Sequence, residues 1–475
     1  MLQSKYRKIS VYLCANSMIF INGVAMQCCK SKFVQKSVMS LLCGWIFLPM
    51  AANAQSLEQV ITYSLDTNPD IRAAYADFKT YETQVKQAEA GYLPTIDLTG
   101  GIGYEYTDSP GTRSLNADAT TLGRRELGLS LTQNLFDGFY TRSEVSRTRS
   151  DATAEQWRLY SKAEDLALQV SKVYVDVIKN EQIIDLTEKN LAYHQETYNK
   201  IKLLTDSGLG SSADLSQISA RLAKAQSNLT AAKNNYLDSK AMFYRIVAQR
   251  PDNLFFPNPN ASLLPESKNE GLKIALKNNP VISAVANDIN AAQYQYQSTK
   301  STYYPKVSFV LKANFDDNLD GVDSSVFANS GESNEVLAMV RFSYNIFSGG
   351  KDEASVKGST YRVNEAKDLN LSAHRQVEES FMLSWNAFEQ LNLQKKYIKM
   401  HINAAKETQL DYQQQFRIGQ RSLLDLLDTE NELHQARIDF VGAQMTEISA
   451  QYRVLHAMGL LLDSLKVALP ASWKG

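Results

Sequence analysis

The stretch Asn134-Leu135-Phe136-Asp137-Gly138 returns 211 residues further on as Asn345-Ile346-Phe347-Ser348-Gly349. A repeat with such a long and constant period indicates one structural unit that is used twice. The nature of that unit therefore decides both the fold and the function. The other pairs at this offset are Asn68-Pro69 with Asn279-Pro280, Pro94 with Pro305, Gly208 with Gly419, and Asp214-Leu215 with Asp425-Leu426.

The N-terminus has the pattern of a secretory signal. Basic residues precede an apolar run from Val38 to Met50, and Ala52-Asn53-Ala54 supplies the small residues of a cleavage site. The run is too short for a stable membrane span, and the alternative is a buried apolar helix. We expect cleavage before Gln55, which would remove residues 1–54, a signal peptide with an upstream extension.

The composition of the exported part excludes several kinds of site. The chain has 475 residues, and all four of its cysteines precede residue 55, which excludes thiol catalysis and cysteine metal sites. The five histidines are scattered without metal-ligand spacing, and no phosphate loop or nucleophile elbow is present. The formal net charge of -1 gives no sign of nucleic-acid binding. We expect no enzyme, no metal, no cofactor and no nucleic-acid partner.

Long stretches with little glycine and no proline predict very long helices. No proline occurs from 111 to 250 or from 306 to 469, and both stretches are rich in Ala, Leu, Gln, Glu and Lys. A helix over 139–205 would be about 100 Å long at 1.5 Å per residue, which indicates a coiled-coil rod. Gly208 and Gly419 mark the turns of two long helical hairpins.

Proline also marks shorter helices and the boundary between the repeats. Each Asn-Pro pair predicts a helix start, with Asn68 or Asn279 as the N-cap and proline at the first helical position. The segment 251–265 holds four prolines and is interpreted as an ordered surface linker. The predicted divisions are a first repeat at 55–250, a second repeat at 266–465, and a C-terminal tail at 466–475.

Two segments in each repeat alternate apolar and polar residues with the period of a β-strand. Strands of about ten residues with one apolar face suit a membrane. We expect β-hairpins at 93–136 and 304–347 with polar loops at 107–124 and 317–335. The alternative is that these hairpins pack against the helices. The apolar positions are Ile96, Leu98, Ile102, Tyr104, Tyr106, Leu127, Leu129 and Leu131, followed by Val307, Phe309, Leu311, Ala313, Phe315, Val340, Phe342, Tyr344 and Ile346.

Four strands per chain cannot close a barrel, and the open edges of a sheet cannot lie in lipid. Several chains must therefore pool their strands if the β-hairpins enter a membrane. Aromatic residues gather where the strands meet the helices, which fits an interfacial belt. Signal, strands and long helices together indicate an oligomer in the outer membrane of a Gram-negative bacterium, with a helical extension in the periplasm.

Two motifs carry a resemblance to a known family. One is the segment from Phe416 to Leu433, Phe-Arg-Ile-Gly-Gln-Arg-Ser-Leu-Leu-Asp-Leu-Leu-Asp-Thr-Glu-Asn-Glu-Leu, and the other is the strand exit from Gln133 to Phe139. With the repeat and the signal, they make the chain similar to the TolC family of outer-membrane channel-tunnel proteins from residue 56 to about 465. The resemblance implies a mixed fold, a membrane β-barrel plus a long α-helical coiled-coil barrel. Four strands per chain would be completed by trimerisation.

The resemblance also implies partners and a function. Channels of this family connect to a periplasmic adaptor, or membrane fusion protein, and to an inner-membrane ABC exporter or other pump. The expected partners are these two proteins, two further copies of the chain, and outer-membrane lipid. The 416–440 region is similar to members that serve type I secretion of large adhesins or toxins. The alternatives are a drug-efflux channel and, in a different class, a periplasmic coiled-coil scaffold that never enters a membrane.

A periplasmic gate of five residues is implied by the resemblance. By motif, Arg421 is the gate arginine, Asp425 and Asp428 form acidic rings, and Asp214 is the acceptor in the first half. Phe416 stands where the family has a tyrosine, and because phenylalanine cannot donate a hydrogen bond, one tie is absent or replaced. Carboxylates from three chains would repel around a narrow axis, and an Arg421–Asp214 pair would offset this. The alternative is that each charge is solvated on a coiled-coil face.

Overall fold

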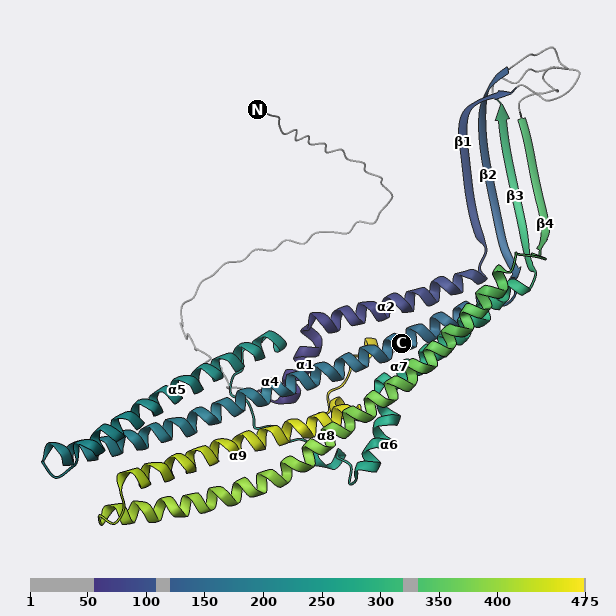
Figure 1. The fold of residues 1–475 in the computed structure, drawn as a ribbon. Helices are drawn as coiled ribbons and strands as arrows, with labels where there is room; N and C mark the ends of the chain where they lie inside the picture. Colours follow the sequence, from purple (N-terminus) through teal and green to yellow (C-terminus); the bar gives the residue numbers. More distant parts are fainter. Residues whose placement is uncertain (1–54, 108–119, 319–331, 474–475) are drawn as a thin grey trace, which may run out of the picture. The chain divides into compact units, whose positions relative to one another are not determined.

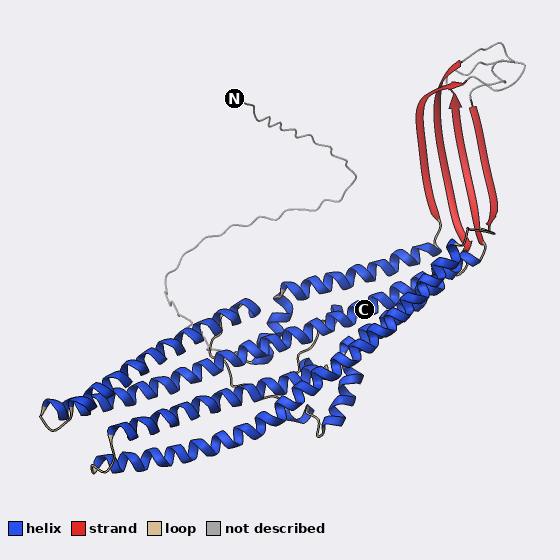
Figure 2. Ribbon diagram, in the orientation of Figure 1, coloured by secondary structure: helices blue, strands red, loops and turns tan. Residues whose placement is uncertain are grey.

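The computed structural model describes residues 55–107, 120–318 and 332–473. The predicted signal peptide and its extension lie outside the described residues, as do the middle parts of both predicted polar loops. Both halves have the same order of elements: two helices, a 3-10 turn, two strands, a long helix and a return helix (Figure 1, Figure 2). The predicted duplication of one unit is therefore confirmed.

The long helices of the two halves, α4 and α8, each have 67 residues, which corresponds to about 100 Å. The first half consists of α1 (Leu57–Thr67), α2 (Pro69–Glu89), η1 (Ala90–Tyr92), β1 (Thr95–Thr107), β2 (Thr120–Phe136), α4 (Tyr140–Asp206) and α5 (Ser212–Val247). The second consists of η2 (Ala261–Leu263), α6 (Lys268–Asn278), α7 (Pro280–Thr299), η3 (Lys300–Tyr303), β3 (Lys306–Asn318), β4 (Glu332–Ser343), α8 (Lys351–Arg417), α9 (Leu423–Ala457), α10 (Leu461–Ser464) and η4 (Ala471–Trp473).

The predicted caps and turns are confirmed. Asn68 and Asn279 cap α2 and α7, and each side-chain oxygen accepts from the backbone N–H two residues on, at 2.8 and 3.0 Å. Both helical hairpins turn at a left-handed glycine, with φ of +79° at Gly208 and +76° at Gly419. A side chain would strain this backbone conformation, so glycine is required at both turns.

The strands form one antiparallel sheet in the order β1-β2-β3-β4 (Figure 1). Its register places predicted apolar positions opposite one another, with Leu98 paired to Leu129 and Phe309 to Val340. Because directly opposed residues share a face, one face of the sheet is apolar. Polar positions such as Thr99, which is paired to Gly128, line the other face.

The strands extend further into the predicted loops than expected. β2 begins at Thr120 and β4 at Glu332, whereas the loops were predicted to continue to 124 and 335. At the start of β4 the pairing continues between polar residues, as in the partners Asp317 and Glu332. Ladder hydrogen bonds are made by the backbone, so side-chain alternation alone underestimates the length of a strand.

At the opposite end, β4 is shorter than predicted. It ends at Ser343, so Tyr344 and Ile346 do not continue the strand. Ser343 is paired with Lys306, and the residue before Lys306 is Pro305. Proline has no N–H to extend the ladder, which explains why pairing stops at this point.

The main hydrophobic core packs α1 and α2 against the middle of α4 and the end of α9. Tyr174 on α4 fastens this region, because its hydroxyl oxygen lies 2.8 Å from the carbonyl oxygen of Gln55 and 2.7 Å from that of Phe255. It thereby joins the start of the described chain to the linker segment. Val467 and Trp473, in the predicted C-terminal tail, are buried and packed against the same core.

A buried carboxylate holds the C-terminal segment against α4. Glu164 is only 7% exposed, and its two oxygens accept from the backbone N–H groups of Leu461 and Leu462 at 3.1 and 3.2 Å. Burial raises the pKa of Glu164 to about 7 from its ordinary value of 4.5. Burial removes water from the carboxylate and disfavours its charged form, so the folded chain holds the proton more tightly than the unfolded chain.

Replacing Glu164 by glutamine should therefore flatten the pH dependence of stability. Since the pKa is higher in the folded state, the stabilisation is complete below pH 4.5 and is lost as the pH rises through about 7. The loss for this group amounts to at most about 3 kcal/mol. Thermal unfolding followed by the helical circular-dichroism signal between pH 5 and 8 measures it. Glu188→Gln, at an exposed site on the same helix, is the control, and equal slopes for wild type and Glu164→Gln would contradict the prediction.

Candidate functional site

The two helical hairpins meet near their turns. The first helical hairpin is α4 with α5, and the second is α8 with α9 (Figure 1). At the tip, which we define as the turns 207–211 and 418–422 with the adjoining helix ends, both hairpins contribute to a small apolar cluster. Phe416 packs against this cluster. Its ring therefore serves packing at the position where the resemblance implies a tyrosine. The buried members are Ile201, Ile218, Leu423 and Leu427.

Arg421 makes its contacts within its own hairpin. Its Nε donates to Oε1 of Gln415 at 2.9 Å, and the guanidinium carbon lies 4.2 Å from the ring centroid of Tyr412. A guanidinium over an aromatic face is a cation–π contact. Nη1 lies 4.0 Å from Oδ2 of Asp425. In one chain, Arg421 is thus stacked on the ring of Tyr412, a contact that the sequence did not reveal.

In the single chain, Asp425 completes the N-terminal cap of α9, whose N-cap residue is Ser422. Its carboxylate accepts from the backbone N–H and the hydroxyl of Ser422 at 3.3 and 2.9 Å, and its own N–H donates to the Ser422 hydroxyl at 3.2 Å. This is a reciprocal capping box, and Ser422-x-x-Asp425 was a local signal that could have revealed it. Asp214 lies in the first turn of α5. Within the described residues of one chain, its side chain has no hydrogen bond or ion pair, so it does not meet Arg421 there.

Asp428 is paired with a residue that the motif comparison missed. Nη2 of Arg221 on α5 lies 2.7 Å from Oδ1 of Asp428 on α9. This ion pair crosses from the first helical hairpin to the second. Arg221 lies seven residues after Asp214, which places both on one helix face, and that spacing was the available signal.

A buried polar layer lies next to this pair. Glu430 on α9 is 5% exposed, and its carboxylate accepts from the amide of Asn190 on α4 at 3.1 Å and from the amide of Gln409 on α8. Burial raises the pKa of Glu430. A buried acceptor without its donors is costly, so these two amides fix how the three helices fit together.

Two of the scattered histidines lie in the same layer. His194 on α4 is buried, and within the described residues its Nδ1 is a buried side-chain nitrogen without a hydrogen-bond partner. Burial lowers the pKa of His194, and the nearby charges of Arg221 and His434 lower it further. Burial also lowers the pKa of His434. Both imidazoles therefore favour the neutral form.

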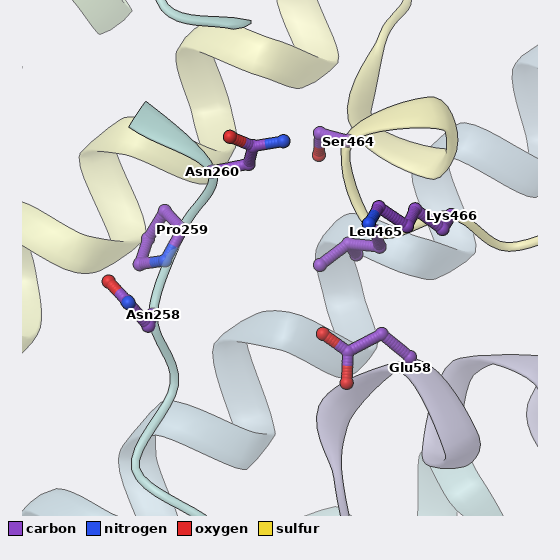
Figure 3. Close-up of a pocket in the computed structure, with 7 residues that line it drawn as sticks. All are labelled: Glu58, Asn258, Pro259, Asn260, Ser464, Leu465 and Lys466. Atoms are coloured by element: carbon purple, nitrogen blue, oxygen red, sulfur yellow. The ribbon is translucent and has the colours of Figure 1, made fainter. Parts of the chain in front are cut away.

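A separate hollow of about 670 Å³ lies where the start of α1, the linker and α10 come together (Figure 3). None of the five predicted gate residues lines it. It therefore belongs to the part of the chain near the core and not to the tip. The lining residues are Glu58, Asn258, Pro259, Asn260, Ser464, Leu465 and Lys466.

Comparison with known sequences identifies the family. The profile of the family described as "Outer membrane efflux protein" matches residues 60–249 and 271–460. The outer membrane efflux protein BepC of Brucella suis biovar 1 (strain 1330) is 26% identical over 419 residues, which cover 88% of each chain. The outer membrane protein TolC of Escherichia coli (strain K12) is 22% identical over 88% of this chain and 85% of its own. The alkaline protease secretion protein AprF of Pseudomonas aeruginosa is 20% identical over 90% and 89%.

Comparison with solved structures agrees on the fold. The Campylobacter jejuni CmeC outer membrane channel superposes with a TM-score of 0.72 at 16% identity, covering 85% of this chain and 86% of that one. Among the described residues, no helix combines the length and the apolar character needed to cross a membrane. The chain is thus a member of the outer membrane efflux protein family, with the TolC-like channel fold, a place in the outer membrane of a Gram-negative bacterium, a helical part in the periplasm, and no enzymatic role.

Proposed function

We propose that three copies of the chain form the outer-membrane exit duct of a tripartite export system. The observation that carries the proposal is the four-stranded sheet with an apolar face and two free edges, β1 and β4. Large apolar side chains on that face are exposed in the single chain, including Ile102 and Phe342. Three sheets joined edge to edge would satisfy the edges and turn this face to lipid. The family membership supports a channel over a periplasmic scaffold.

The cargo that we propose is a large secreted protein such as an adhesin or toxin. The system would then be type I secretion, with a periplasmic adaptor and an inner-membrane ABC exporter as partners. The Phe416–Leu433 segment and the likeness to a protein named for protease secretion support this reading. The alternative is efflux of small molecules, which is supported by the family description and by the name of the Brucella relative.

We also propose that the tip is the gate of this duct, formed by Asp214, Phe416, Arg421, Asp425 and Asp428. Their placement at the ends of two adjacent helical hairpins supports a closable constriction. The division into repeats at 55–250 and 266–465 around the linker is part of the same proposal. The family matches at 60–249 and 271–460 fall inside these bounds.

The duct should be purified from membranes as a trimer. Crosslinking in detergent is expected to give a three-chain species, and this species should conduct ions in planar bilayers. A monodisperse monomer that is folded without detergent would contradict the proposal. Deleting the gene distinguishes the two proposed cargoes. Loss of a large secreted protein with unchanged drug resistance supports secretion, whereas lower drug resistance with unchanged protein secretion supports efflux.

A further inference from the structure

Near the tip, the polar contacts fall into two groups, those within a hairpin and those between hairpins. Arg421 contacts Gln415, Tyr412 and Asp425, all in the second helical hairpin. By contrast, the Arg221–Asp428 ion pair joins the first hairpin to the second. The contact between Asn190 on α4 and Glu430 on α9 does the same. Separating the hairpins would break the second group of contacts and leave the first intact.

We infer that Arg221 and Asn190 are positioning residues of the proposed gate, which fasten the second helical hairpin to the first through Asp428 and Glu430. We name these four residues the cross-hairpin seam. The inference rests on the proposed function, because it assigns the parts of the tip that must separate when the duct opens.

The two contacts of the seam have different strengths. Arg221 and Asp428 are 27% and 57% exposed at their side chains, so solvent screens their attraction and the pair contributes modestly. Glu430 is buried, and its carboxylate relies on the amides of Asn190 and Gln409. Losing Asn190 would leave a buried acceptor short of a donor. The exposed pair is thus easy to release, whereas the buried contact sets the register of the hairpins.

The apolar cluster at the tip is small, so polar groups fix how the two helical hairpins align. Four buried residues make up the cluster there, whereas the main core lies further along the helices. Apolar contacts are non-directional and tolerate sliding, but a hydrogen bond is lost when its partners shift by a residue. A single polar contact in a helical seam fixes the register in the same way. The cross-hairpin seam therefore specifies one closed arrangement of the hairpins. The hairpins can separate from it without disrupting a large hydrophobic core.

The test uses a label on each hairpin and matched substitutions. All four native cysteines precede residue 55, so cysteines introduced at the exposed turn residues Leu209 and Ile418 can be spin-labelled in the exported chain. Double-labelled chains are diluted with unlabelled chains in the detergent-solubilised assembly. The distance between labels then reports the separation of the two hairpins in one chain. Single-channel conductance in planar bilayers is recorded for the same variants without labels.

Arg221→Gln should lengthen and broaden the label distance. It should also shift the closed-to-open equilibrium of each chain up to roughly fivefold toward the open arrangement, and thereby raise resting conductance. Lys233→Gln is the matched control, since Lys233 is also on α5 but pairs with Glu188 inside the first hairpin at 3.4 Å. It should change neither readout. The double variant Arg221→Glu with Asp428→Arg restores an opposite-charge pair and should return the label distance toward wild type. Its conductance is not compared, because Asp428 also belongs to the proposed acidic ring.

Asn190→Leu tests the buried half of the seam and should also broaden the distance, with restoration by Glu430→Leu. The inference is overturned if Arg221→Gln and Lys233→Gln give the same label distances, or if the charge exchange restores nothing. A wild-type protein without conductance would defeat the proposed duct. The label distances would still decide whether the seam joins the hairpins.

Discussion

Leu98→Arg should largely prevent assembly in the outer membrane, whereas Thr99→Arg should assemble normally. Leu98 is 71% exposed in the single chain and lies on the apolar face of the sheet. On the proposed barrel this face meets lipid, where an arginine costs roughly 2–4 kcal/mol near the midplane and less toward the interfaces. Thr99 is the next residue and lies on the opposite face, where a charge would meet water in the lumen.

The measurement is the yield of heat-resistant trimer in isolated outer membranes. Thr99 makes the better control, because Ser308, a second position on the polar face, is paired with Arg341. An arginine at Ser308 would place like charges opposite each other and cost stability for a separate reason. Equal trimer yields for Leu98→Arg and Thr99→Arg would show that the two faces are not divided between lipid and lumen.

Much of the fold could be predicted because it depends on patterns among residues that are close in the sequence. The scarcity of proline and glycine predicted the two long helices, and Gly208 and Gly419 predicted the turns that follow them. Alternation gave the faces of the sheet, since a residue and its neighbour point to opposite sides. Each of these signals depends only on residues that are near one another in the sequence.

Strand ends could not be predicted in the same way. Glu332, in the predicted loop, is paired with Asp317 of β3, and the end of β4 at Ser343 lies opposite Lys306, which follows a proline. A strand ends where its neighbour stops offering backbone groups. That information belongs to the pair of strands, so the alternation of one strand did not contain it.

The tip shows the same difference between local and distant signals. The capping box that Ser422 and Asp425 form at the start of α9 is local and could be predicted from their spacing. The pair between Arg221 and Asp428 joins residues more than 200 positions apart and exists because two separate hairpins pack side by side. Motif comparison selected Asp428 and missed Arg221, because a motif identifies one partner of a contact and the fold supplies the other.

Arg421→Ser should raise the single-channel conductance of the assembled trimer in planar bilayers. In one chain, the guanidinium lies over Tyr412, with Nη1 4.0 Å from Oδ2 of Asp425. Within the described residues it makes no hydrogen bond or ion pair with the first hairpin. We expect this held guanidinium to reach Asp214 in the closed trimer and to offset the repulsion between the acidic rings. Its loss leaves the carboxylates of three chains around one axis with less compensation. At up to about 1 kcal/mol for each exposed pair, three pairs would favour the closed state by up to about 3 kcal/mol.

Arg417→Ser is the matched control for this experiment. Arg417 is exposed in the last turn of α8, and its loss removes the same charge four residues away. Conductance should rise for Arg421→Ser and stay at the wild-type level for Arg417→Ser. Similar conductance for both variants, in trimers that assemble normally, would show that Arg421 is a surface charge resting on Tyr412.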